Sequence, residues 1–237
     1  MKLSVGSVIV IFMVALIVGI AESPVAAGHE ENTLRARAVI RGGVNNSSII
    51  GEVIFTQRSC PGCPTPGLTA PATDPGFKYF PEPTVTIVAR IQGLTAEMAP
   101  GAHGMHIHEN GVCTPGDSFA SAGSHFDPGP FSSAGSQVDA NHPFHMGDIP
   151  NLFVKKSGEG FLRHHTSRIT LSPGPLSVFD ANGSAVILHL NPDRGITGAV
   201  GASGGSRVAC GVIEMLSNGD ADDYSYVDFD DDGDRDH

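Results

Sequence analysis

Several residue types and patterns are scarce in this chain of 237 residues. It contains no tryptophan, three tyrosines and four cysteines, and the 3.6-residue periodicity of an amphipathic helix is sustained nowhere along it. Lysine and arginine together number 14 against 25 aspartates and glutamates, and they form no basic stripe. These shortages argue against a helical protein and predict no nucleic-acid partner.

Long apolar runs are also scarce, and the one that occurs extends from Val8 to Ile20 after Lys2. It is shorter than the ~20 residues that a membrane span needs, and small residues follow it at 25–27. A positive start, a short apolar segment and an A-x-A-like site are typical of a signal peptide. We therefore predict a signal peptide over residues 1–27, no stable membrane association, and a secreted, extracellular or periplasmic protein.

Glycine and proline are abundant, with 30 and 17 residues, as expected for short strands joined by turns. The negative charge is uneven, because residues 220–237 hold nine aspartates and one arginine. This composition predicts an acidic disordered tail over residues 217–237. Residues 28–33 are predicted to be a linker before a domain at residues 34–216.

Period-two alternation of apolar residues predicts strands near residues 34–41, 50–56 and 84–91. Shorter strands are predicted near residues 103–108, 151–154, 160–163, 168–171, 185–190 and 207–214. Residues 58–83 contain seven prolines and predict a long loop insertion. The pattern predicts an all-β fold, an eight-stranded antiparallel Greek-key β-sandwich or flattened barrel with long metal-binding loops.

Histidine is unusually abundant, with 11 in the chain and six of them between residues 103 and 145. His106 and His108 are two residues apart in a predicted strand, so both imidazoles lie on one face. Neighbouring imidazoles suit a transition metal. The further candidate ligands are His125, His142, His145, Asp148 and His189. Histidines with an aspartate, separated by turns, predict a metal site.

Five short motifs occur in the order HGMHIHENGVC, SAGSHFDP, HMGD, HLNPD and GGSRVACGVIE. Together they resemble the exported type of the copper/zinc superoxide dismutase family, over residues 34–216. The resemblance implies an enzyme that disproportionates superoxide to dioxygen and hydrogen peroxide by Cu(II)/Cu(I) cycling, with a structural zinc. Dimers are common in this family, so the resemblance also allows a homodimer.

The resemblance implies a role for individual residues. The implied copper ligands are His106, His108, His125 and His189. The implied zinc ligands are His125, His142, His145 and Asp148. The catalytic residues would be Arg207 beside the copper and His125 as the imidazole shared by both metals. Asp193 would be the carboxylate that links the two metal sites, His103 a structural histidine, and Cys113 and Cys210 a disulfide pair.

Two departures from the family pattern leave alternatives open. Ser136 stands nine residues before His145, where the family has a zinc histidine, so His142 is the only candidate for that ligand. A copper-only superoxide dismutase and a non-catalytic metal-binding domain on the same scaffold are the alternative interpretations. Cys60 and Cys63 predict a second, local disulfide, with pairing to another chain or an accessory metal site as alternatives.

Charged residues are also few between the last copper histidine and the catalytic arginine. Only Asp193 and Arg194 are charged between His189 and Arg207. We therefore expect the attraction of an anionic substrate to depend mainly on Arg207 and the metals, with Arg194 as a further candidate.

Overall fold

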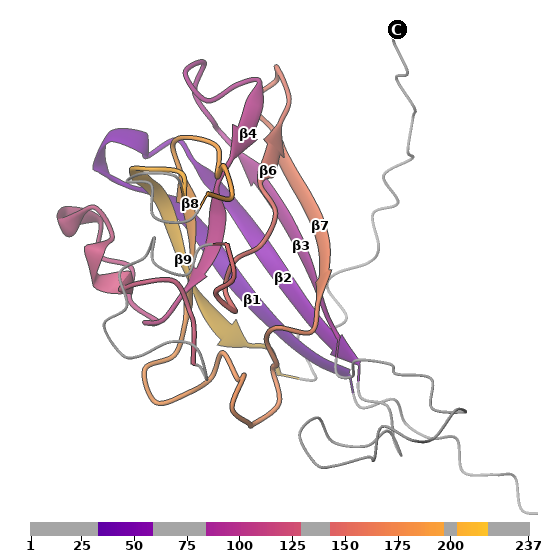
Figure 1. Cartoon of the computed structure of the whole chain (residues 1–237). Coiled ribbons are helices and arrows are strands. Elements are labelled where there is room, and N and C mark those ends of the chain that lie inside the picture. Colours follow the sequence, from indigo (N-terminus) through magenta and orange to yellow (C-terminus); the bar gives the residue numbers. More distant parts are fainter. Residues whose placement is uncertain (1–32, 59–83, 129–142, 197–202, 218–237) are drawn as a thin grey trace, which may run out of the picture. The chain divides into compact units, whose positions relative to one another are not determined.

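The computed structural model describes residues 33–58, 84–128, 143–196 and 203–217. In these ranges the chain forms nine strands of one antiparallel sheet and three short 3-10 helices (Figure 1). The strands are β1 (Thr33–Gly42), β2 (Ile50–Arg58), β3 (Val85–Gln92), β4 (Gly101–His103), β5 (Met105–His108), β6 (Leu152–Val154), β7 (Gly160–Thr166), β8 (Ala185–His189) and β9 (Arg207–Met215). The short helices are η1 (Val44–Asn46), η2 (Pro115–Asp117) and η3 (Ala120–Ala122).

Several predicted segments are not tested by this structure. The predicted signal peptide and nearly all of the predicted linker, the 58–83 loop and the acidic tail lie outside the described residues. Within the described ranges, no helix has the length and apolar character that a membrane crossing requires.

The order of the strands shows how the sheet closes. It is β4-β6-β7-β3-β2-β1-β9-β8-β5. The two outermost strands, β4 and β5, are consecutive in the chain and are separated only by Gly104, so both edges of the sheet come from one segment. Strands β6 and β7 lie between β4 and β3, whereas β8 and β9 lie between β5 and β1. This order confirms the predicted all-β, antiparallel Greek-key barrel.

The sheet has nine strands where eight are predicted, and residues 101–108 form two of them, β4 and β5, in place of the one strand predicted near 103–108. Strand β4 pairs with β6, whereas β5 pairs with β8 at the other edge. Between them, the Gly104 N–H donates to the Asn191 carbonyl at 2.9 Å, and the Gly104 carbonyl accepts from the His189 N–H at 2.8 Å. A Cβ on Gly104 would lie 3.3 Å from His106 Cε1. A glycine at this switch therefore leaves room for a histidine of the site.

The strand predicted at residues 168–171 is absent. In this described segment Thr170 makes only an isolated bridge, to Ser177. The buried Gln57 side chain of β2 reaches the segment instead, and its Oε1 accepts the Leu171 N–H. A side chain thus satisfies a backbone group that a neighbouring strand would otherwise satisfy. The apolar alternation here reflects burial without strand pairing.

The long strands bury one face, as their alternation predicts. Ala36, Ala38 and Ile40 of β1 are buried, and their neighbours in sequence are more exposed. Strands β5 and β8 differ, because every residue of both strands is buried. The candidate metal-binding histidines of β5 and β8 therefore lie on strands that are buried on both faces.

Candidate metal centre

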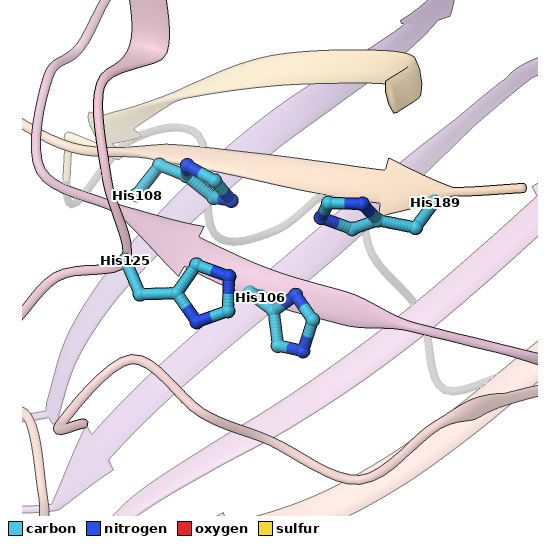
Figure 2. Close-up of side chains that lie close together, drawn as sticks. All are labelled: His106, His108, His125 and His189. Atoms are coloured by element: carbon cyan, nitrogen blue, oxygen red, sulfur yellow. The ribbon is translucent and has the colours of Figure 1, made fainter. Parts of the chain in front are cut away.

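Two groups of side chains with metal-binding atoms lie in the described part of the chain. The four-histidine cluster consists of His106, His108, His125 and His189 (Figure 2). The aspartate group consists of His125, His145 and Asp148. In each group the ligand atoms, one from each residue, lie within 4.8 Å of one another, and every member is buried. His125 belongs to both groups, as expected for a ligand shared by two metals.

Pairing of β5 with β8 brings the four-histidine cluster together. His106 and His108 lie on β5, and His189 is the last residue of β8. His125 lies in a loop and forms an isolated bridge with His108. The ring centroids of His106 and His125 are 4.1 Å apart, and those of His108 and His189 are 5.9 Å apart. Two strands thus position three of the imidazoles, and the bridge positions the fourth.

Backbone carbonyls fix the orientation of two rings in the cluster. His108 Nδ1 lies 3.0 Å from the Gly123 oxygen, and His189 Nδ1 lies 2.9 Å from the Gly205 oxygen. Because a carbonyl oxygen only accepts, Nδ1 is the donor in both rings and Nε2 keeps its lone pair. Both Nε2 atoms are buried and have no hydrogen-bond partner among the described residues. The lone pair of each Nε2 is therefore available to bind a cation.

The protonation states of the cluster also suit a metal. Burial lowers the pKa of His108 and His189 well below the ordinary value of 6.5, and nearby imidazoles lower both pKa values further. Burial and the His106 imidazole lower the pKa of His125 to about 3, although its hydrogen bond with Asp148 acts in the opposite direction. These three imidazoles are therefore neutral at pH 7, which is the form of histidine that binds metals.

The aspartate group is held together by a single carboxylate. Asp148 Oδ1 lies 2.6 Å from His125 Nδ1, and Asp148 Oδ2 lies 3.1 Å from His145 Nδ1. The Asp148 Oδ2 also accepts the His145 N–H at 2.9 Å. Burial alone would raise the pKa of Asp148, but the hydrogen bonds with the two imidazoles lower it below its ordinary value. Two imidazoles and an ionised carboxylate are a donor set that fits zinc. The predicted further ligand, His142, lies outside the described residues.

Arg207 is the first residue of β9 and contacts the loop that carries His125. Its Nη1 donates to the Phe119 carbonyl and its Nη2 to the Gly123 carbonyl, both at 2.6 Å. The Gly123 oxygen therefore receives hydrogen bonds from both Arg207 and His108. Burial lowers the pKa of Arg207, and two nearby carboxylates act in the opposite direction. The structure thus places a guanidinium beside the four-histidine cluster.

A disulfide fastens this loop to the sheet. The predicted pair Cys113 and Cys210 is bonded, with a Cα–Cα distance of 5.7 Å. Cys210 lies on β9 three residues after Arg207, whereas Cys113 precedes η2. The bond joins positions 97 residues apart in the chain, so it links the loop beside the cluster to the strand that carries the arginine. Cys60 and Cys63 lie outside the described residues.

Two further polar residues, Asp193 and Asn151, adjoin the four-histidine cluster: Asp193 contacts His106, and Asn151 contacts Asp193. Asp193 Oδ2 lies 3.0 Å from His106 Nε2, so the structure places this carboxylate against the four-histidine cluster. The side chain of Asn151 forms hydrogen bonds with the main chain of Asp193. Sequence reasoning missed Asn151, because a carboxamide three residues after Asp148 carries no metal-binding signature. Its role depends on a contact 42 residues away, which the sequence does not reveal.

The remaining described histidines lie outside both groups. His103 Nδ1 is 2.7 Å from the Leu190 oxygen, and His103 Nε2 is 2.6 Å from the Met98 oxygen. Both ring nitrogens thus meet backbone carbonyls, which agrees with the structural role expected for this residue. His164 and His165 lie on β7 and belong to neither group.

Known proteins of similar sequence include copper/zinc superoxide dismutases. A family model described as copper/zinc superoxide dismutase (SODC) matches residues 76–213. A Cu-Zn superoxide dismutase of Deinococcus radiodurans is 35% identical over 147 residues, which cover 59% of this chain and 76% of that protein. An extracellular Cu-Zn superoxide dismutase of Haemonchus contortus is 36% identical over 138 residues, which cover 56% of this chain and 70% of that protein.

Solved structures show the same fold. A double mutant of a SOD-like protein from Bacillus subtilis matches with a TM-score of 0.50 and 25% identity, covering 74% of this chain and 95% of that chain. The clock protein EA4 matches with a TM-score of 0.50 and 29% identity, covering 77% of this chain and 94% of that chain. In both cases almost the whole of the known structure is matched.

Proposed function

Because the chain belongs to the copper/zinc superoxide dismutase family, whose members use copper and zinc, we propose that it disproportionates superoxide at the four-histidine cluster. Two superoxide anions and two protons give one molecule of dioxygen and one of hydrogen peroxide. Copper bound in this cluster supplies the one-electron redox chemistry that the reaction needs. The observation that carries the proposal is the gathering of four buried imidazoles within reach of one ion.

The residues of the cluster fit copper by their chemistry. Imidazole is a good ligand for copper, and neutral rings bind a cation without first losing a proton. His108 and His189 each direct a lone pair inward from a buried Nε2 that has no hydrogen-bond partner in the described ranges. Burying such an atom without a partner costs free energy, and a bound cation removes that cost.

His125 is the residue that we assign to proton transfer. Its Nδ1 is held by Asp148 Oδ1, so its Nε2 is the nitrogen that belongs to the four-histidine cluster. In this role Nε2 takes up a proton in one half of the cycle and releases it to the product peroxide in the other half. Burial keeps the pKa of this imidazole low, which favours release of the proton.

Arg207 is the residue that we assign to substrate binding. A guanidinium has five N–H donors, and the hydrogen bonds to the Phe119 and Gly123 carbonyls use one from each terminal nitrogen. The same two bonds hold the group beside the four-histidine cluster. Its permanent positive charge attracts the superoxide anion, and its other donors can bind the oxygen atoms.

The aspartate group is the proposed zinc site. Structural zinc takes four ligands, and the described residues supply His125, His145 and Asp148. We propose His142 as the fourth ligand. Zinc at this point would hold His125 in place, because that imidazole belongs to both groups. If His142 is not a ligand, the proposal reduces to a copper-only superoxide dismutase.

Metal analysis combined with the reaction rate tests these assignments. The full chain is stripped of metal, loaded with Cu(II), with Zn(II) or with both, and mixed with superoxide generated by pulse radiolysis. We expect decay to accelerate only in samples that contain copper, and we expect the chain to retain one zinc. A copper-loaded chain without activity would contradict the proposal and favour a non-catalytic metal-binding domain. Full activity without retained zinc would favour the copper-only enzyme.

Export from the cytoplasm is also part of the proposed function. The Cys113–Cys210 disulfide supports it, because disulfides persist in oxidising compartments. The likeness to an extracellular enzyme of Haemonchus contortus supports it as well. Fractionation of the source cells tests export, and the presence of the chain in the cytoplasm with reduced Cys113 and Cys210 would contradict it. The homodimer stays a prediction.

A further inference from the structure

Asn151 occupies a rigid position between the aspartate group and the core. It follows Asp148 by three residues and directly precedes β6. Its neighbours Ile149 and Leu152 are both buried in the core, with exposed fractions of 5% and 0%. The backbone at Asn151 is therefore fixed on both sides, so its side chain can serve as a fixed point for another segment.

That other segment is the loop after β8, which carries Asp193. Asn151 Oδ1 accepts the Asp193 N–H at 2.8 Å, and Asn151 Nδ2 donates to the Asp193 carbonyl at 2.9 Å. One carboxamide thus pairs with both main-chain groups of a single residue, as a neighbouring strand would do. The Gly195 N–H donates to Asp193 Oδ1 at 2.7 Å and fixes the other end of the side chain.

The restrained carboxylate acts on a histidine of the four-histidine cluster. Asp193 Oδ2 lies 3.0 Å from His106 Nε2, and the His106 side chain is fully buried. A carboxylate at this distance favours the tautomer with the proton on Nε2, which leaves the lone pair on Nδ1. The position of Asp193 therefore decides which nitrogen of His106 is available to a metal.

From these contacts we infer that Asn151 is a positioning residue, which holds Asp193 so that His106 presents Nδ1 to the metal of the four-histidine cluster. The inference rests on the proposed function and extends it to a residue without metal-binding chemistry. It also connects the two metal groups through the main chain, because Asn151 lies on the same short segment as Asp148. A change at Asn151 acts on His106 only through Asp193.

The test measures the His106 tautomer and the Cu(II) affinity in the full chain. The tautomer is read from ¹⁵N NMR of the metal-free protein, and Cu(II) affinity from competition with a chelator of known affinity. The variants are Asn151→Ala, Asp193→Asn and the double variant. The control is Asn182→Ala, since Asn182 is an exposed asparagine far from these contacts in sequence. If Asn151→Ala does not fold, Asn151→Ser, which keeps a small polar side chain, takes its place.

We expect Asn151→Ala to weaken Cu(II) binding by about tenfold and to populate the second His106 tautomer, as is typical when an outer partner of a ligand is lost. In the Asp193→Asn background the same change should have little further effect, because the two residues act in series. Asn182→Ala should match the wild type. Unchanged tautomer and affinity in Asn151→Ala, or effects that multiply in the double variant, would overturn the inference. A wild-type chain that binds no Cu(II) would overturn the proposed function, whereas the NMR comparison would still decide the role of Asn151.

Discussion

The four-histidine cluster and the aspartate group are built in different ways, although they share His125. The cluster is built on strands: β5 and β8 carry three of its imidazoles, and backbone carbonyls orient His108 and His189. The aspartate group lies on loops, which isolated backbone bridges connect to β5, and the Asp148 carboxylate joins its side chains. Backbone carbonyls therefore orient side chains of the strand-held cluster, whereas the side chains of the loop-held group orient one another.

This difference has a consequence for the two metals. A site whose ligands are already oriented loses little conformational freedom when the ion binds. A site whose ligands hold one another must exchange hydrogen bonds for metal bonds, as Asp148 must do with both of its imidazoles. We therefore expect copper ligation to resist changes in the loops, and zinc ligation to be sensitive to single changes there.

The largest effect is expected from breaking the strand-held cluster with His189→Ala. This change removes the Nε2 that β8 presents, and no other described histidine lies close enough to replace it. Copper-dependent dismutation should be abolished, as measured by superoxide decay in copper-loaded protein. His165→Ala, at an exposed position on β7, is the matched control and should keep the rate. A wild-type rate in copper-loaded His189→Ala would remove the cluster from the mechanism.

A smaller effect is expected from breaking the loop-held group with Asp148→Asn. The amide cannot replace the ionised carboxylate that joins His125 and His145. Zinc affinity should fall by about tenfold to a hundredfold, while Cu(II) affinity changes much less, because the strands still hold the other three imidazoles. Chelator competition measures both affinities, with Asp180→Asn as an exposed control. Equal losses for both metals would show that the two groups are not separately supported.

The substitution Arg207→Glu tests the role of the positive charge beside the strand-held cluster. The change reverses a charge beside the cluster and touches no candidate ligand. We expect kcat/KM to fall by about tenfold at low salt, with copper content unchanged, because electrostatic attraction of a small anion is lost. Arg163→Glu makes the same charge change at an exposed position on β7 and serves as the control. If Arg207→Glu and the wild type react at one rate in low salt, the guanidinium has no part in catalysis.

The sequence predicts the strand-held cluster better than the loop-held group. Alternation along the HGMHIH motif already places His106 and His108 on one face, and the resemblance adds His125, His189 and Arg207. Local periodicity therefore predicts the His106 and His108 pair, whereas the other three positions rest on the resemblance. In the structure the four histidines lie together, and Arg207 contacts the loop that carries His125.

The contacts that the sequence does not reveal are those made across loops. Asn151 contacts Asp193 because the fold brings together two segments that lie 42 residues apart in the sequence. The division of residues 101–108 into two strands depends on different partners at the two edges of the sheet, which no local pattern encodes. For the same reason, the apolar alternation at residues 168–171 predicts a strand although a Gln57 side chain meets that segment.

A pH dependence of stability separates the two groups in the metal-free protein. The pKa of His108, His125 and His189 lies below 6.5 in the folded chain, so the unfolded chain binds more protons below that pH. Stability is therefore full above about pH 6.5 and falls as the pH drops, by about 1 kcal/mol per pH unit for each histidine. The lowered pKa of Asp148 adds a loss that begins only near its ordinary value of 3.8.

Urea unfolding of the metal-free chain between pH 7.5 and 5 measures this slope. His108→Gln should reduce the slope, whereas His165→Ala, outside both groups, should leave it unchanged. Stability that is flat or rises as the pH falls through this range would show that the histidines of the strand-held cluster are not buried as neutral rings.

X-ray absorption spectroscopy of the full chain loaded with one equivalent of Cu(II) tests the central claim most directly. The spectrum reports the number of imidazole rings around the copper ion. We predict four imidazoles, contributed by His106, His108, His125 and His189, and loss of one imidazole in His189→Ala. A spectrum with two imidazoles or fewer, or one that His189→Ala leaves unchanged, would contradict it.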